Sequence, residues 1–114
     1  QPHILESVLP ENIEKLEDIC NFLKGERNEL VLEGKSISGS IPASFVTNQY
    51  LKHLIILNLS KNNLGGCIPN EISCLKVLEQ LDLSENNLIG KLPNQLFTLT
   101  KLKLLHLKDN NLTG

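Results

Sequence analysis

The side chains that could perform chemistry in this chain are few and scattered. The nucleophiles, bases and soft metal ligands are Cys20, Cys67, Cys74, His3, His53 and His106. A cysteine acting with a histidine is the only nucleophile–base pair that these residues could form, and the candidates sit at unrelated positions. Zinc needs three or four such ligands at short spacing, which the chain does not offer. We therefore expect no enzyme, no metal site and no cofactor.

The cysteines leave their pairing open. An odd number leaves at least one thiol free or bonded to another molecule. A disulfide between Cys67 and Cys74 is geometrically conceivable. Small thiols in or near the hydrophobic core are the favoured interpretation of the cysteines.

Composition excludes several classes of protein. The length of 114 residues suits one domain, and 11 Lys and Arg against 13 Asp and Glu give a net charge of −2. Binding nucleic acid through phosphate contacts usually requires a basic excess, so we expect no nucleic-acid partner. The clearest apolar run, 54–57, is far too short to cross a membrane. The chain has 24 Leu and 13 Asn but no Met or Trp, which indicates one packing environment used repeatedly.

A set of identical residues recurs every 24 positions, as in Leu57, Leu81 and Leu105. The same spacing relates four further sets, which are Leu59, Leu83 and Leu107; Asn62, Asn86 and Asn110; Leu64, Leu88 and Leu112; and Gly66, Gly90 and Gly114. An earlier copy begins at Leu30, 27 residues before Leu57, so it carries a three-residue insertion, most simply within 46–50. In that copy Lys35 stands where the others have asparagine.

Each copy is typical of one coil of a solenoid. The Leu-x-Leu step has the period of a short strand, which directs the leucines inward and the residues between them outward. An inward asparagine three residues after the second leucine can bond backbone groups of neighbouring coils. The following Gly-x-Ile/Leu-Pro stretch favours a 3₁₀ or irregular return path. Stacked copies therefore predict an α/β solenoid with one parallel sheet.

The stretch 54–69 reads Leu-x-x-Leu-x-Leu-x-x-Asn-x-Leu-x-Gly-x-Ile-Pro. It resembles the leucine-rich repeat, in the subtype typical of plant receptor ectodomains and secreted inhibitors. The resemblance covers about 30–114 and implies a right-handed coil with a concave parallel β-sheet and a 3₁₀ or irregular convex side. It names no particular ligand, because the family binds very diverse partners. Plant ectodomains often carry paired cysteines and a tryptophan motif in the N-terminal cap, and this chain has neither.

The N-terminal part has a different period. We divide the chain into a capping segment, 1–28, and repeats, 29–114, with about four strands and an incomplete last repeat. Steps of four and three relate Leu9, Ile13, Leu16, Cys20 and Leu23, which predicts an amphipathic helix over about 10–24. Such a helix would cover the leucines of the first coil. The segment also matches the back half of a repeat, so a coil degenerated into a cap is the alternative.

The outward positions of the predicted sheet form the candidate binding face. They are Glu29, Val31, Glu33, Ile56, Asn58, Ser60, Lys61, Gln80, Asp82, Ser84, Glu85, Leu104, His106, Lys108 and Asp109. Their mixture of apolar and charged groups suits a protein or peptide, and a rigid core would hold them at little entropic cost. We predict a receptor-like or inhibitor-like protein-recognition module. The alternative is a short intracellular scaffold subunit docked in a larger assembly.

Two features bear on compartment and assembly. Glycosylation sequons begin at Asn58 and Asn111, and Asn111 is the better acceptor because Asn58 would project from the inner sheet. The sequons and the repeat subtype favour an extracellular location, whereas the sparse cysteines favour the intracellular alternative. The sequence stops at Gly114, before the next Ile-Pro and any polar cap. We expect a fragment of a longer array or an end covered by another molecule, and an open end favours self-association.

Overall fold

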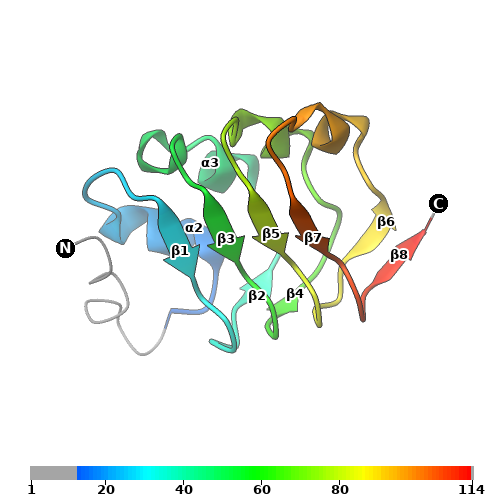
Figure 1. Ribbon diagram of the computed structural model, residues 1–114. Coiled ribbons are helices and arrows are strands. Elements are labelled where there is room, and N and C mark those ends of the chain that lie inside the picture. The colour runs from blue at the N-terminus through cyan, green and yellow to red at the C-terminus, as the bar shows by residue number, and fades with distance from the viewer. Residues whose placement is uncertain (1–12, 114) are drawn as a thin grey trace.

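The four Leu-x-Leu segments form one parallel sheet. The structure, a computed structural model, describes residues 13–113. The strands are β1 (Glu29–Val31), β3 (Ile56–Asn58), β5 (Gln80–Asp82) and β7 (Leu104–His106), and they lie side by side in that order (Figure 1). Their register aligns Leu30, Leu57, Leu81 and Leu105. The predicted solenoid with a parallel sheet is confirmed, because the spacing of the leucines is the register of the sheet.

The repeated leucines make up the core. Both leucines of the central strands are buried, and Leu81 and Leu83 are 1% and 0% exposed. Leu75 and Leu78, on the return path, are fully buried as well. In the last coil Leu105 and Leu107 are only partly buried, because no further coil packs on them in this structure. The core therefore runs along the solenoid axis as one column, and its leucines are partly exposed at the last coil.

The repeated asparagines link neighbouring coils. Asn62 Oδ1 accepts hydrogen bonds from the Lys35 and Ile37 N–H groups at 2.9 and 3.0 Å. Its Nδ2 donates to the carbonyl oxygens of Leu32 and Leu59 at 3.0 and 2.9 Å. Asn86 and Asn110 make equivalent bonds one and two coils further on. The predicted bonding of neighbouring coils by inward asparagines is confirmed. These bonds, here called the asparagine ladder, satisfy backbone groups that the turn would otherwise bury unpaired.

Short helices form the side of the solenoid opposite the sheet. The 24-residue coils contribute the 3₁₀ helices η3 (Asn70–Cys74) and η4 (Asn94–Thr98), which begin directly after Pro69 and Pro93. The 27-residue coil instead contributes α3 (Ala43–Val46) and the 3₁₀ helix η2 (Gln49–Leu51). The insertion is therefore absorbed on this side, and the register of the sheet is unaffected.

Two small parallel sheets follow the turns after the main strands, and these two sheets were not predicted from the sequence. One pairs β2 (Ser38–Gly39) with β4 (Asn63–Leu64), and the other pairs β6 (Ile89–Lys91) with β8 (Asn111–Thr113). The return path was expected to be irregular or 3₁₀ from the turn onward. It begins extended, because stacking on the previous coil gives its backbone groups partners.

The N-terminal helical segment is shorter than expected. Within the described residues it comprises α2 (Leu16–Ile19) and the 3₁₀ helix η1 (Cys20–Phe22), not the predicted 10–24. Residues 10–12 lie outside the described residues. Lys15 is extended (φ −135°, ψ 150°) because it forms a parallel bridge with Ser38, whose N–H donates to the Glu14 carbonyl at 2.7 Å.

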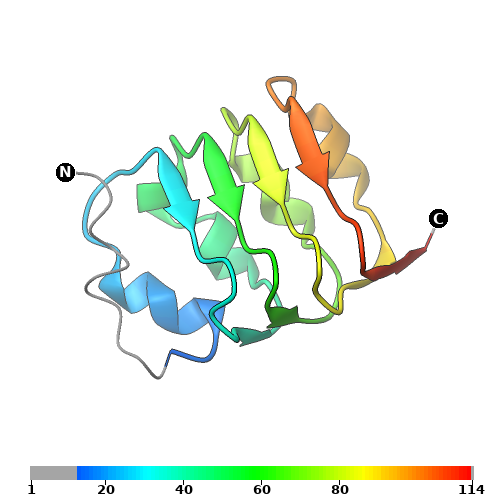
Figure 2. The same ribbon diagram turned by 60° about the horizontal axis from the view of Figure 1, so that its bottom comes forward.

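The segment before β1 covers the first coil. Leu16 and Ile19 are fully buried and join the core, and Figure 2 shows α2 beside the β1 end of the solenoid. The bridge of Lys15 places this segment where a preceding coil would lie. We propose that residues 13–28 are a coil degenerated into a cap.

Substitution of Gly90 by alanine is expected to destabilise the fold by about 1–3 kcal/mol. Gly90 has a φ of +79°, and an added Cβ would lie 2.8 Å from Cys67 Sγ. Gly66→Ala is the matched control, because Gly66 has a φ of +69° but its Cβ would meet only Ser40 Cβ at 3.4 Å. Chemical denaturation should show a larger loss for Gly90→Ala, which Cys67→Ala partly restores. Equal losses with no restoration would contradict a clash with Cys67.

Candidate functional site

The outward side chains of the four strands stand in rows across the sheet. The strand register aligns Glu29, Ile56, Gln80 and Leu104 in one row. The adjacent row contains Val31, Asn58, Asp82 and His106. All eight are exposed or half-buried, as predicted, because they alternate with the core leucines. Leu104 is 48% exposed and Val31 37% exposed, so two large apolar side chains are accessible on this face.

One of the predicted binding residues does not face outward. Ser60 is 3% exposed, and its hydroxyl donates to Asn58 Oδ1 at 2.6 Å. In the next coil the Ser84 hydroxyl likewise donates to Asp82 Oδ1 at 2.6 Å, and Ser84 is half-buried. Simple alternation fails here because the chain has left the strand and begun to turn. An Asn or Asp two residues before a serine is the sequence signal for this local hydrogen-bonded turn.

The outermost candidate residues belong to turns and not to the sheet. Lys61, Glu85 and Asp109 have φ values of 59°, 56° and 62°, and Gly34 occupies the equivalent position with 66°. Their side chains are exposed, as are those of Glu33 and Lys108. Lys61 Nζ lies 3.3 Å from Glu33 Oε2, so this pair is neutralised across neighbouring coils. These residues form a charged rim along one edge of the sheet.

The centre of the concave sheet is hollowed. The hollow has a volume of about 80 Å³, and its outward lining residues are Ile56, Asn58, Gln80, Asp82, Leu104 and His106. Small-molecule pockets are several times larger, at about 300–1,000 Å³. The hollow is therefore suited to one side chain of a larger partner. It brings together six of the fifteen candidate residues, from three consecutive coils.

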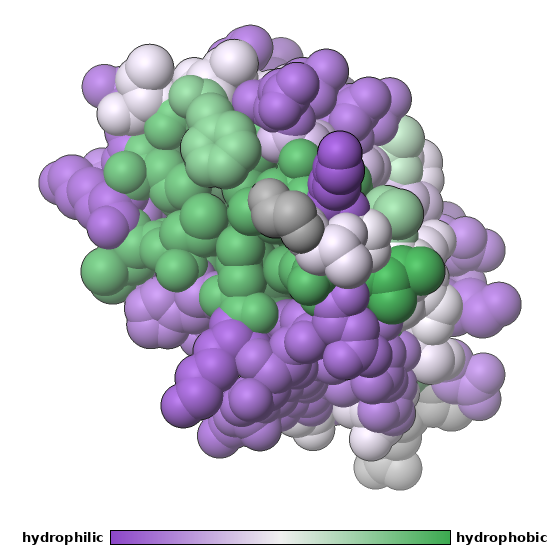
Figure 3. Space-filling view, turned by 90° about the vertical axis from the view of Figure 1, so that its right-hand side faces the viewer, coloured by the Kyte–Doolittle hydropathy of each residue, from purple (hydrophilic) through white to green (hydrophobic). Residues whose placement is uncertain are grey.

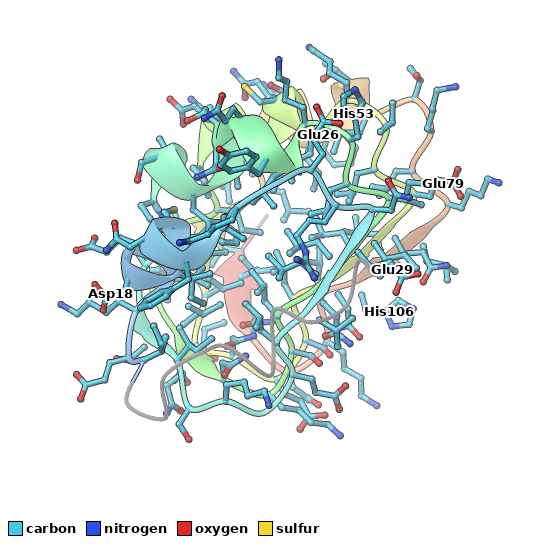
Figure 4. All side chains as sticks on the ribbon, turned by 90° about the vertical axis from the view of Figure 1, so that its left-hand side faces the viewer. Asp18, Glu26, Glu29, His53, Glu79 and His106 are labelled. Atoms are coloured by element: carbon cyan, nitrogen blue, oxygen red, sulfur yellow. The ribbon has the colours of Figure 1, made fainter. Side chains whose placement is uncertain are left out.

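The ionisable side chains labelled in Figure 4 lie on different sides of the molecule. Figure 4 shows Glu29, Glu79 and His106 on that side, Asp18 beside α2 on the opposite side, and Glu26 next to His53. His53 Nδ1 lies 3.2 Å from Glu26 Oε1, away from the hollow. His106 Nδ1 lies 3.8 Å from Asp82 Oδ2. Among the described residues His106 is thus the histidine that contributes to the candidate site.

The cysteines are unpaired and do not form a site. Cys67 and Cys74 are exposed, so the expectation of thiols in or near the core is wrong for these two residues. Cys67 Sγ lies close to Gly90. Cys20 packs against the core, and burial raises the pKa of its thiol. No group of three or more His, Cys, Asp or Glu within residues 13–113 could hold a metal ion. Over the same residues, no helix has the length and apolar character needed to cross a membrane.

Comparison with known proteins identifies the repeat. A family model described as leucine-rich repeat matches residues 28–88. No match was found among curated proteins.

Several solved structures are similar. One is the BIR3–SERK2 complex from Arabidopsis thaliana, at 39% identity and a TM-score of 0.74, covering 93% of this chain and 51% of that one. A second is the LRR ectodomain of the plant membrane receptor kinase GASSHO1/SCHENGEN3 from Arabidopsis thaliana, solved with CASPARIAN STRIP INTEGRITY FACTOR 2. Its identity is 36% and its TM-score 0.72, covering 77% of this chain and 10% of that one. A third is a plant ice-binding protein, at 36% identity and a TM-score of 0.77, covering 90% and 32%.

This chain spans about half of the length of the first of these similar proteins, and a third or less of the other two. The matched segment, 28–88, covers more than half of this chain and contains β1, β3, β5 and two of the three ladder asparagines. The receptor structures share the plant-type repeat that the spacing of leucine, asparagine and Ile-Pro predicted. The chain belongs to the leucine-rich repeat family and is of the plant type.

Proposed function

We propose that this chain binds a protein or peptide through the concave face of its sheet, in a receptor-like or inhibitor-like role. The observation that carries the proposal is the hollow on that face, where the exposed Leu104 stands beside the polar Gln80, Asp82 and His106. The similar structures that are protein complexes support it, because BIR3 is solved with SERK2 and GASSHO1/SCHENGEN3 with its factor.

The architecture suits recognition for a physical reason. The strands are fixed by the core and by the asparagine ladder, so the side chains on the sheet keep their positions before a partner arrives. Binding then costs little ordering entropy, and more of the contact energy appears as affinity. An apolar group in a hollow with a polar surround is also the usual anatomy of an interface centre.

The test is selection of a displayed random peptide library against the 114-residue chain, followed by affinity measurement on the selected peptides. Leu104→Ser should weaken binding by about tenfold or more, because a central apolar contact is lost. Phe97→Ser is the matched control, since Phe97 is 68% exposed on η4, on the opposite side. Peptides that bind both variants like the parent chain, or no selected peptide at all, would overturn the proposal.

An extracellular location is proposed with this role, and the ectodomain among the similar structures supports it. When the chain is expressed through a eukaryotic secretory route, Asn111 is expected to carry sugar and Asn58 is not. Asn111 is exposed in β8, whereas Asn58 Oδ1 accepts two hydrogen bonds from the buried Ser60. Mass spectrometry of the peptides checks this. Sugar on Asn58 with none on Asn111 would contradict the assignment of the inner face.

The end of the solenoid that carries β7 and β8 is apolar. Figure 3 shows a broad hydrophobic patch across the end that carries β7 and β8. The partly buried leucines of this end are Leu92, Leu102, Leu105, Leu107 and Leu112. The opposite end is covered by α2, so two copies would meet through their leucine ends.

We expect the 114-residue chain to self-associate through this end. Sedimentation over a concentration series should show dimers or larger species, which Leu112→Asp reduces because it places a charge in the contact. Ser44→Asp, exposed on α3 in the first coil, is the control and should leave association unchanged. A monomer at all concentrations would exclude self-association.

A further inference from the structure

The hollow on the concave face contains a carboxylate with an unused oxygen. Asp82 Oδ1 accepts hydrogen bonds from the Ser84 N–H and hydroxyl at 3.0 and 2.6 Å. These two bonds fix the orientation of the carboxylate. Its Oδ2 has His106 Nδ1 at 3.8 Å, which is beyond hydrogen-bond distance. The Asp82 side chain is 30% exposed, so Oδ2 can be reached from the hollow.

The charge around Asp82 favours a cation. The fifteen candidate residues include five carboxylates and two lysines, a charge of −3 with histidine neutral, whereas the whole chain carries −2. The binding face is therefore more acidic than the rest of the molecule. Lys61 is already paired with Glu33, and His106 is the one basic group of the described residues within 4 Å of the Asp82 carboxylate.

The flanks of the hollow are apolar. Ile56 on β3 lies at one side of β5 and Leu104 on β7 at the other, aligned with Gln80 in the register. A side chain entering between them would place aliphatic carbons against Ile56 and Leu104 and its tip near Asp82. Lysine and arginine have this form, an apolar stem that ends in a cation.

We propose that the hollow accepts a lysine or arginine side chain of a peptide or protein partner, with Asp82 Oδ2 accepting its hydrogen bond. This inference rests on the proposed function and specifies the chemistry of the partner. A charge-assisted hydrogen bond to a half-buried carboxylate contributes more than an exposed ion pair, because water screens it less. Asp82 is the partner-binding residue, and Ser84 positions it.

The test uses the peptides selected from the random library against the 114-residue chain. They should share a basic residue, and its replacement by citrulline for arginine, or norleucine for lysine, should weaken binding by about tenfold or more. Asp82→Asn keeps an acceptor for Ser84 but removes the charge, so this variant should bind the basic and neutral peptides almost equally. Glu71→Gln, exposed on η3 at the side opposite the sheet, is the matched control and should keep the full difference. Unchanged thermal unfolding of both variants shows that the fold is intact.

The outcomes separate this inference from the proposed function. Peptides that lose affinity for Leu104→Ser but bind equally well in basic and neutral forms would overturn the basic-residue inference and leave concave-face binding standing. Selected peptides with an acidic residue whose binding depends on His106 would overturn it as well. Peptides indifferent to every concave-face variant would defeat both.

Discussion

Substitution of Leu81 by alanine is expected to lower the free energy of unfolding by about 2–5 kcal/mol. Leu81 is 1% exposed and lies in the middle of β5, with Leu57 and Leu105 beside it in the register. Removing its isobutyl group leaves a cavity that the strands cannot close, because the sheet hydrogen bonds and the ladder hold their spacing. Urea denaturation of the parent and the variant measures the loss.

The control for this prediction is Leu104→Ala, in the neighbouring strand. Leu104 is 48% exposed, so its truncation removes little buried surface and should change the stability by about 0.5 kcal/mol or less. Comparable losses at the two leucines would show that the inward and outward faces of the sheet are wrongly assigned. A loss below about 0.5 kcal/mol at Leu81 would show that it is not a core residue.

Substitution of Asn62 by leucine is expected to cost about 3 kcal/mol or more. Leucine has the same branched arrangement of heavy atoms as asparagine but cannot hydrogen-bond, so the Ile37 N–H and the Leu32 carbonyl lose their partner. Both groups belong to buried residues, where an unpaired polar group costs free energy. The loss should appear in chemical denaturation.

Asn63 provides the adjacent control. It is exposed at the start of β4, and only its backbone takes part in pairing, so Asn63→Ala should be nearly neutral. A similar loss at both positions would mean that the ladder contributes no more than an ordinary surface asparagine.

The repeat could be predicted in detail because the same residue types recur at a fixed spacing. A 24-residue recurrence of leucine and asparagine specifies the strand, its register and the inward amide together. The N-terminal helix could not be placed as well, because its start depends on the pairing of Lys15 with Ser38, residues far apart in the sequence. Helical periodicity contains no information on such a contact.

The outward positions of the strands could be predicted from the sequence, but the geometry of the candidate site could not. The outward rows from Glu29 to His106 follow from alternation within each strand. Ser60 was misplaced because alternation was carried past the strand end at Asn58, where the side chain of Asn58 closes a turn. The hollow and the orientation of Asp82 require three coils side by side, and a single repeat contains neither.

The equal register of β3, β5 and β7 has a consequence for how this gene can change in length. Ile56, Gln80 and Leu104 are aligned, so deletion of residues 80–103 would join β3 to β7 with every leucine still facing inward. A deletion of one residue more or fewer within a strand would turn its leucines to the solvent. The three extra residues of the 27-residue coil are accommodated between the proline and the next strand, in the segment with α3 and η2. Whole coils can thus be gained or lost in one step, while the register of the remaining strands and the inward direction of their leucines stay the same.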